Sequence, residues 1–217
     1  MTGEELPARR LRRLGLELAA MAQTGNAFAR DRYDVKRFAR LAEIAAEIQA
    51  ALVGTAPEEI LSRLEIDGGY ATPHVDVRGV LVRNDRILLV QEAADRCWTL
   101  PGGWADVLDT PRVAVEREFA EEAGLAVRAD RLAFVHDGVI SNGHLDGGPP
   151  FHIWKLFFIC TEDAGGEPQA GLDEETTDVG FFGLDDLPPL SARRTTEAQL
   201  RLALTYAAEP SRPAVTD

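Results

Sequence analysis

Residues 100–125 read LPGGWADVLDTPRVAVEREFAEEAGL, and this stretch decides how the rest of the chain is interpreted. The glycine pair Gly102-Gly103 allows the backbone to turn sharply and to approach a ligand closely. Thr110 suits the N-cap of a helix, and Pro111 suits the first helical position. Gly124 suits the position directly after a helix ends. The stretch therefore predicts the end of a strand, a glycine turn, a loop and a capped helix.

The predicted helix, residues 111–123, carries three carboxylates on one face. At about 100° per residue, Glu118, Glu121 and Glu122 fall within an arc of about 100°, and apolar residues cover the other side. A solvated acidic face costs only about 0.2–0.5 kcal/mol per like-charged pair. In a cleft with an effective dielectric constant of about 20, two carboxylates about 5 Å apart repel by roughly 3 kcal/mol. The pattern therefore indicates either a solvated face or a site for a hard cation such as Mg²⁺, which prefers oxygen ligands.

The stretch resembles the Nudix box. In that motif a glycine is followed after five residues by a glutamate and, after seven more, by Arg-Glu-apolar-any-Glu-Glu-any-Gly-apolar. Gly103 takes the first position, and residues 117–125, REFAEEAGL, match the second half in full. Asp109 stands where the family has its first glutamate, and Leu108 replaces the glycine often seen before it. The resemblance covers about residues 71–207 and implies an α/β fold, a Nudix-type α/β/α sandwich around a mixed sheet.

The resemblance also implies an activity. Nudix enzymes hydrolyse a nucleoside diphosphate linked to another moiety X, giving a nucleoside monophosphate and a phosphorylated X, with Mg²⁺ or Mn²⁺ as cofactor. Carried over by position, Glu118 and Glu122 become the principal metal ligands. Glu121 becomes a further ligand, direct or through water, and the Gly103 carbonyl completes the shell. Arg117 is expected to orient a carboxylate of the cluster through a charge-assisted hydrogen bond.

Further site residues are expected outside this helix. Many Nudix enzymes take another carboxylate, as a ligand or a base, from a loop outside the box. Here Glu175 precedes a predicted strand in about the right place, with an ordinary exposed loop as the alternative. Trp104 is expected to stack on a base or to cover the sheet edge. Asp109 and His144 are assigned to substrate binding, with a surface loop as the alternative for His144.

The first 66 residues predict a small all-helical N-terminal domain. Apolar residues recur there at spacings of three and four, as one face of an amphipathic helix requires: Leu11, Leu14, Leu18 and Met21. Residues 24–26 predict the end of this first helix, and Asp31 or Asp34 is expected to cap a second. A third begins near Thr55. Three short helices bury little surface alone, so we expect them to pack against the main body or against a second subunit, as a homodimer.

Residues 67–217 predict the Nudix domain. Its β-rich runs cover residues 75–82, 86–91, 132–140, 151–160 and 178–182. A second helix is expected at about residues 196–207, followed by a loose tail at 209–217. Asn84-Asp85 predicts a tight hairpin without the favoured glycine. Trp98 and Trp154 are expected in the core.

Composition excludes several classes of protein. The 217 residues are 45% hydrophobic and 27% charged, and no apolar run reaches the roughly 18–20 residues of a membrane span. No apolar segment follows the N-terminal arginines as in a secretory signal, and Cys97 and Cys160 fit no disulfide or metal-binding spacing, so a cytoplasmic location is expected. The formal charge of −13 argues against DNA binding. An acidic chain binds phosphorylated substrates when divalent cations lie between the two.

The substrate stays open among CDP-choline, ADP-ribose and NDP-sugars. A proline about 15 residues beyond the box, associated with ADP-ribose in the family, is absent, since Val139 and Ile140 stand there. RNA processing is an alternative favoured only by the first helix, whose four arginines otherwise predict a solvated face: Arg9, Arg10, Arg12 and Arg13. A non-catalytic nucleotide sensor is a further alternative. Asp109 favours a sensor, and the intact Arg-Glu-Glu-Glu set opposes it.

Overall fold

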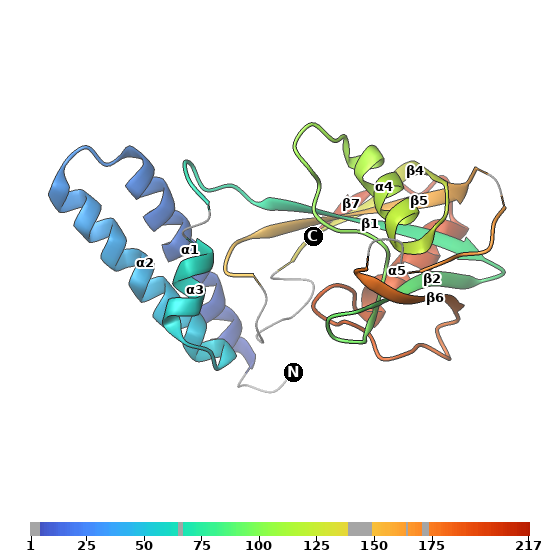
Figure 1. Ribbon diagram of the computed structural model, residues 1–217, viewed down its shortest axis with the longest axis horizontal. Coiled ribbons are helices and arrows are strands. Elements are labelled where there is room, and N and C mark those ends of the chain that lie inside the picture. The colour runs from blue at the N-terminus through green and yellow to red at the C-terminus, as the bar shows by residue number, and fades with distance from the viewer. Residues whose placement is uncertain (1–4, 65–66, 139–148, 164, 171–173) are drawn as a thin grey trace. The chain divides into compact units, whose positions relative to one another are not determined.

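The computed structural model describes residues 5–64, 67–138, 149–163, 165–170 and 174–217 (Figure 1). The chain divides into two compact units. The first unit contains Met1–His74 and Gly143–Ile153, and the second contains Val75–Asn142 and Trp154–Asp217. A segment from later in the chain thus belongs to the helical unit, which the sequence does not indicate. The domain boundary between residues 66 and 67 stays a prediction.

Three helices build the first unit: α1 (Glu5–Phe28), α2 (Arg32–Val53) and α3 (Pro57–Leu64). The cap of α2 is confirmed, because the Asp31 carboxylate accepts hydrogen bonds from two backbone N–H groups of the first turn. The predicted end of α1 at residues 24–26 is wrong. A Cβ atom at Gly25 would lie 2.2 Å from the Phe38 ring, so this glycine lets α1 and α2 pack closely and does not end the helix.

Small residues make up most of the buried positions on α1 and α2. The buried residues of these two helices include Leu16, Ala19, Ala22, Ala45, Ala46 and Ala50. The predicted apolar stripe of α1 lies elsewhere on the helix, since Leu11, Leu14 and Met21 are 45%, 42% and 50% exposed. The described part of the helical unit therefore leaves this stripe open.

One arginine of α1 departs from the predicted solvated face. Arg12 is only 4% exposed, and its Nη2 donates a hydrogen bond to the carbonyl oxygen of Pro149 at 3.0 Å. The later segment that belongs to the helical unit covers this position of the helix. The other three arginines of the run, Arg9, Arg10 and Arg13, are exposed as predicted.

A mixed sheet forms the second unit, with strand order β3-β2-β1-β5-β4-β7 and with β6 paired to β2. The strands are β1 (His74–Arg83), β2 (Arg86–Glu92), β3 (Trp98–Thr99), β4 (Val127–Asp137), β5 (Ile153–Glu162), β6 (Thr176–Phe182) and β7 (Val215–Thr216). Two helices, α4 (Pro111–Ala123) and α5 (Glu197–Ala208), pack into separate apolar cores on the two faces (Figure 1). The predicted α/β/α sandwich, preceded by helices, is confirmed.

The hairpin between β1 and β2 forms without glycine. Asn84 and Asp85 have φ angles of 51° and 58°, the positive values that a type I′ turn requires, and these residue types tolerate them better than most. The predicted strand at residues 132–140 begins earlier, at Val127. Two register shifts against β5 interrupt its alternation, which hides the first residues from a period-two pattern.

Two further predictions about this unit are wrong. The tail is not loose throughout, because β7 pairs in parallel with β4 at Phe134 and Val135. Trp154 is 48% exposed, whereas Trp98 is 8% exposed and lies in the core as predicted. Trp154 stands between two buried residues at the start of β5, so strand alternation turns it outward. Among the described residues, no helix combines the length and the apolar character needed to cross a membrane.

Gly79 on β1 sets how closely α4 packs on the sheet, and replacing it tests this contact. A Cβ atom there would lie 2.1 Å from Cε2 of Phe119 and 2.9 Å from Cγ1 of Val115. We expect Gly79→Ala to lower the free energy of unfolding by about 1–3 kcal/mol, the usual cost of overpacking. Urea unfolding followed by tryptophan fluorescence measures it. Gly165→Ala, where no atom lies within 4 Å of the new Cβ, is the control. Equal midpoints for the two variants would contradict the packing argument.

Candidate active site

The glycine turn lies against β1. Backbone hydrogen bonds join Gly79 N–H to the Pro101 carbonyl at 2.9 Å and Val77 N–H to the Gly103 carbonyl at 2.8 Å. Gly102 has φ +140°, and a Cβ atom there would lie 2.0 Å from the Val77 carbonyl oxygen. Only glycine fits this close approach. These two backbone hydrogen bonds join the turn to β1.

The helix α4 begins and ends where the sequence predicts. The Thr110 side chain accepts a hydrogen bond from Val113 N–H, Pro111 is the first helical residue, and Gly124 ends the helix with φ +64°. Glu118 and Glu122 are only 8% and 4% exposed. The interpretation of these two carboxylates as a solvated face is therefore wrong.

Burial changes the chemistry of both carboxylates. Desolvation raises the pKa of Glu122 to about 8, although the Arg78 charge and a hydrogen bond from Gly102 N–H at 2.9 Å oppose it. Desolvation also raises the pKa of Glu118 to about 7, against the charge of Arg117. The two side chains lie one helical turn apart, and their burial disfavours the negatively charged form of each carboxylate. A bound cation would stabilise this negative charge, which the neighbouring arginines compensate only in part.

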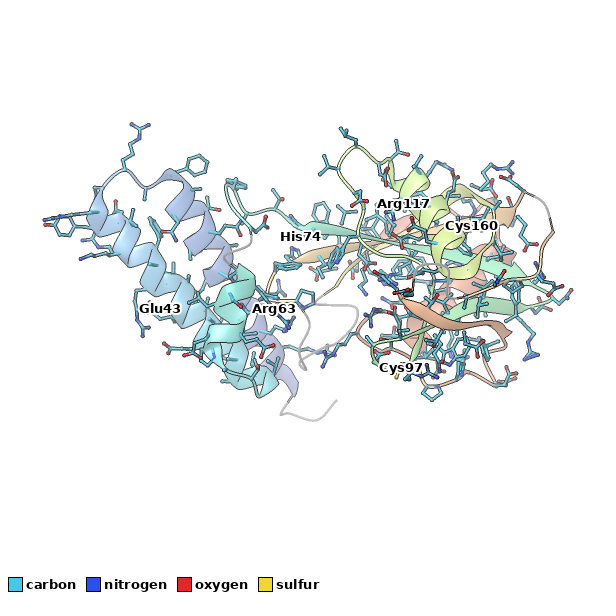
Figure 2. All side chains as sticks on the ribbon, viewed as in Figure 1. Glu43, Arg63, His74, Cys97, Arg117 and Cys160 are labelled. Atoms are coloured by element: carbon cyan, nitrogen blue, oxygen red, sulfur yellow. The ribbon has the colours of Figure 1, made fainter. Side chains whose placement is uncertain are left out.

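Arg117, labelled beside α4 in Figure 2, connects an exposed carboxylate to a buried one. Its Nη1 lies 3.0 Å from Oε1 of Glu118 and 2.9 Å from Oε2 of Glu121. Its Nε lies 3.4 Å from Oδ2 of Asp109, and its Nη2 lies 3.4 Å from the Trp104 carbonyl oxygen. The arginine therefore links the loop before α4 to the acidic face of the helix, as a residue that orients carboxylates would.

The remaining predicted residues lie at different depths. Trp104 is 46% exposed and forms a β-bridge with Asp76. Glu175 is exposed directly before β6, and its charge contributes to the raised pKa of Glu118. Leu108 has φ +79°, a conformation that explains why glycine suits this position better. His144 lies outside the described residues, as do Val139 and Ile140.

Sequence reasoning missed three buried charged residues on the strands beside this site. Asp76 and Arg78 of β1 are 5% and 3% exposed and form a bidentate ion pair at 2.8 and 2.7 Å. Glu92 of β2 is 8% exposed, and burial raises its pKa against the charge of Arg194, whose Nε lies 3.0 Å away. A signal was available for Asp76 and Arg78, which alternate with valines in β1, but Glu92 is the last residue of β2 and interrupts no apolar run.

A fourth buried charge, Lys155 of β5, supports the segment that carries Arg194. Lys155 is 4% exposed, and its Nζ donates hydrogen bonds to the carbonyl oxygens of Arg193 and Arg194 at 3.1 and 2.6 Å. Burial lowers the pKa of Lys155 to about 8. The lysine therefore ties the chain before α5 to the sheet.

The donor atoms fit a hard divalent cation. They are carboxylate and carbonyl oxygens, the ligands that Mg²⁺ and Mn²⁺ accept most readily. A Cβ atom at Gly103 would lie 3.2 Å from both carboxylate oxygens of Glu118, so the missing side chain leaves room beside this carboxylate. Within the described ranges, no three His, Cys, Asp or Glu side chains already converge as a ligand group. Glu121 is instead held by Arg117.

The family model for the NUDIX domain matches residues 72–202, more than half of the chain. The chain belongs to the Nudix family. A second model, described as a UDP-X-like, N-terminal oligomerisation domain, matches residues 9–64 of this Nudix hydrolase. The family that the box indicated is thereby confirmed, and so is the enzyme class.

Two of the following three relatives of this Nudix hydrolase match more than nine tenths of the chain. A protein of Bacillus subtilis with the name "Putative ADP-ribose pyrophosphatase" is 36% identical over 92% of this chain and 93% of its own. The crystal structure of an ADP-ribose pyrophosphatase from Streptococcus suis is 39% identical, covers 67% of this chain and 100% of its own, and gives a TM-score of 0.59. The crystal structure of a UDP-X diphosphatase is 28% identical, covers 97% of this chain and 99% of its own, and gives 0.58.

The burial of Lys155 in this Nudix domain can be tested by measuring how the unfolding free energy depends on pH. The pKa falls from 10.5 to about 8 on folding, so the unfolded chain binds this proton more tightly between those values. The unfolding free energy of wild type therefore rises with pH in this window, because deprotonation removes the cost of burying the charge. Relative to Lys155→Met, we expect wild type to gain roughly 2 kcal/mol between pH 8 and pH 10.

Urea unfolding at the two pH values measures this gain. Lys36→Met, which removes an exposed lysine on α2, is the control and is expected to follow wild type. A constant difference between wild type and Lys155→Met across the window would contradict the lowered pKa.

Proposed function

We propose that this Nudix hydrolase cleaves the phosphoanhydride bond of nucleoside diphosphate derivatives and depends on Mg²⁺ or Mn²⁺. ADP-ribose and UDP-linked compounds are the first candidates, with CDP-choline as a further one. The observation that carries the proposal is the pair of buried carboxylates, Glu118 and Glu122, held one turn apart against the glycine turn. The names of relatives that match along both units support the substrate class.

In this proposal Glu118, Glu122 and the Gly103 carbonyl hold the cation. Glu121, which contacts Arg117, is a further ligand of the cation, either directly or through water. When bound, a divalent cation neutralises diphosphate charge and makes a nearby water a better nucleophile. Arg117 keeps Glu118 oriented through its charge-assisted contact at 3.0 Å. The acidic chain can then receive an anionic substrate.

Residues at the rim complete the proposed site. Glu175, exposed before β6, accepts the proton of the attacking water as general base. Trp104, which is 46% exposed, stacks on the base or on a ring of the moiety X. Asp109, which is shorter than the glutamate of the family, contacts Arg117 from the loop before α4. Its proposed role is to position this arginine. His144 and a cytoplasmic location stay predictions.

A substrate panel with product analysis tests the proposed reaction. We expect AMP and ribose 5-phosphate from ADP-ribose, UMP and a sugar 1-phosphate from a UDP-sugar, or CMP and phosphocholine from CDP-choline. Turnover is expected with Mg²⁺ or Mn²⁺ and is expected to stop with EDTA, because the carboxylates alone repel a diphosphate. Phosphorus NMR identifies the products. Tight nucleotide binding without any product would support the sensor alternative and overturn this proposal.

Glu122→Gln tests the role of the deepest carboxylate. The amide oxygen can still accept the hydrogen bond from Gly102 N–H, but the charge is lost. We expect turnover to fall by at least about 100-fold, a typical cost of removing one charge-stabilising group. Unfolding free energy measured in EDTA is expected to stay equal or to rise, because a neutral group replaces a buried carboxylate.

The matched control for that variant is Glu116→Gln on the same helix. Glu116 lies outside the acidic cluster and accepts a hydrogen bond from Ala129 N–H at 2.9 Å. Turnover of this control is expected to stay near that of wild type. An active Glu122→Gln enzyme would remove Glu122 from the metal ligands.

We also propose that α1 carries the homodimer contact. Its apolar stripe follows the spacing of three and four that a helix seam requires, with Leu11, Leu14 and Met21 exposed and Leu18 half-buried. Exposed apolar patches of this kind mark interaction sites. The match of residues 9–64 to a domain described by oligomerisation supports a second copy of this chain as the occupant.

Charge introduced into this stripe is expected to separate the dimer. Leu14→Glu combined with Met21→Glu places two carboxylates in the seam, where they would lose hydration without partners. Size-exclusion chromatography with light scattering should give a dimer for wild type and a monomer for the double variant. Arg13→Glu, an exposed position of α1 outside the stripe, should stay dimeric. A monomeric wild type would defeat the assignment.

A further inference from the structure

The peptide groups of Leu100 are held by side chains. Leu100 is fully buried and follows the last residue of β3. Its N–H donates to Oγ1 of Thr195 at 3.2 Å. Its carbonyl oxygen accepts from Nη1 of Arg78 at 3.1 Å and from Oγ1 of Thr99 at 3.3 Å. The residue that leads into the glycine turn is therefore positioned from two other elements, β1 and the segment before α5.

Asp76 fixes the direction in which Arg78 points. Arg78 Nε and Nη2 donate to the two carboxylate oxygens of Asp76 at 2.8 and 2.7 Å. The two residues stand two positions apart on β1 and share one face of the sheet. These two hydrogen bonds occupy one edge of the planar guanidinium. The remaining nitrogen, Nη1, donates to the Leu100 carbonyl oxygen. At 3% exposure the arginine has little room for another rotamer.

The geometry after Leu100 is tightly coupled to the carboxylates. Three residues later the chain reaches Gly103, whose missing Cβ would lie 3.2 Å from the Glu118 carboxylate oxygens. Between them, Gly102 N–H donates to Glu122 at 2.9 Å. A shift of the Leu100 carbonyl therefore moves both contacts. Arg78 also places a buried positive charge within electrostatic reach of Glu122 and Glu92.

We propose that Arg78, clamped by Asp76, is a positioning residue of the active site. It holds the Leu100 carbonyl and thereby sets the glycine turn against Glu118 and Glu122. The catalytic consequence rests on the proposed function, whereas the structural consequence does not. The Asp76–Arg78 pair lies outside the Nudix box, and no residue of the pair is a proposed metal ligand.

Hydrogen exchange measured by mass spectrometry tests the positioning in metal-free protein. Arg78→Lys keeps the charge but cannot hold both Asp76 and the Leu100 carbonyl. We expect exchange of the peptide over residues 98–105 to accelerate about tenfold or more, the effect of losing one hydrogen bond to a charged group. Peptides over β4 are expected to keep their protection. Asp76→Asn, which leaves Arg78 without its clamp, is the second variant and is expected to give the same local change.

The matched control is Arg83→Lys at the other end of β1. Arg83 pairs with Glu162, far along the strand from the glycine turn. We expect this control to leave exchange over residues 98–105 unchanged. Unchanged exchange in both Arg78→Lys and Asp76→Asn, or equal acceleration in every peptide, would overturn the positioning role.

Kinetics and metal binding give the functional readout. For Arg78→Lys we expect kcat to fall about 100-fold, the cost of a small misplacement of catalytic groups, with KM much less affected. Mn²⁺ titrated into the protein without substrate is expected to bind more weakly. Wild-type kcat in Arg78→Lys would overturn the proposal. If wild type hydrolyses no nucleotide derivative, the proposed function fails, and hydrogen exchange still decides the role of Arg78.

Discussion

Two backbone hydrogen bonds hold the glycine turn at residues 101–103 against β1, and the arrangement of the site follows from them. They bring the turn so close that a Cβ atom at Gly102 would lie 2.0 Å from the Val77 carbonyl oxygen. The same approach sets an amide of the turn beside Glu122 and the end of the turn beside Glu118. The backbone of β1 therefore places the turn beside the two carboxylates of α4.

This arrangement buries carboxylates where desolvation of their charge is costly. Glu92, Glu118 and Glu122 are each less than a tenth exposed, and desolvation raises the pKa of all three. Arginines offset part of the cost, as Arg78 and Arg194 do beside Glu122 and Glu92. Their compensation is incomplete, since the raised pKa values persist. Under the proposed function, the uncompensated charge of these carboxylates would be available to a bound cation, at a cost in stability.

The sequence predicts best what is encoded locally. The bounds of α4 follow from its capping residues, and the hairpin at residues 84–85 follows from residue types that tolerate positive φ. Predictions fail where contact with a segment distant in sequence determines the helix bounds or the burial of a residue. Gly25 continues a helix because the Phe38 ring packs on it, and Arg12 is buried because a segment more than a hundred residues later contacts it. Neither contact leaves a trace in the local pattern.

The candidate site shows the same division between local and distant information. The box identifies the carboxylates by spacing, but spacing alone leaves open whether Glu118 and Glu122 are solvated, and burial against the turn decides it. Asp76 and Arg78 carry a weaker signal, because a charged residue in a strand also suits a solvated edge. In a strand whose neighbours are apolar on both sides, however, such charges cannot reach water, and each needs a partner within the fold. The partner of Asp76 is Arg78, and the third contact of Arg78 is the backbone that leads into the turn. The ion pair inside this strand thus also satisfies a backbone carbonyl, and that carbonyl leads into the candidate active site.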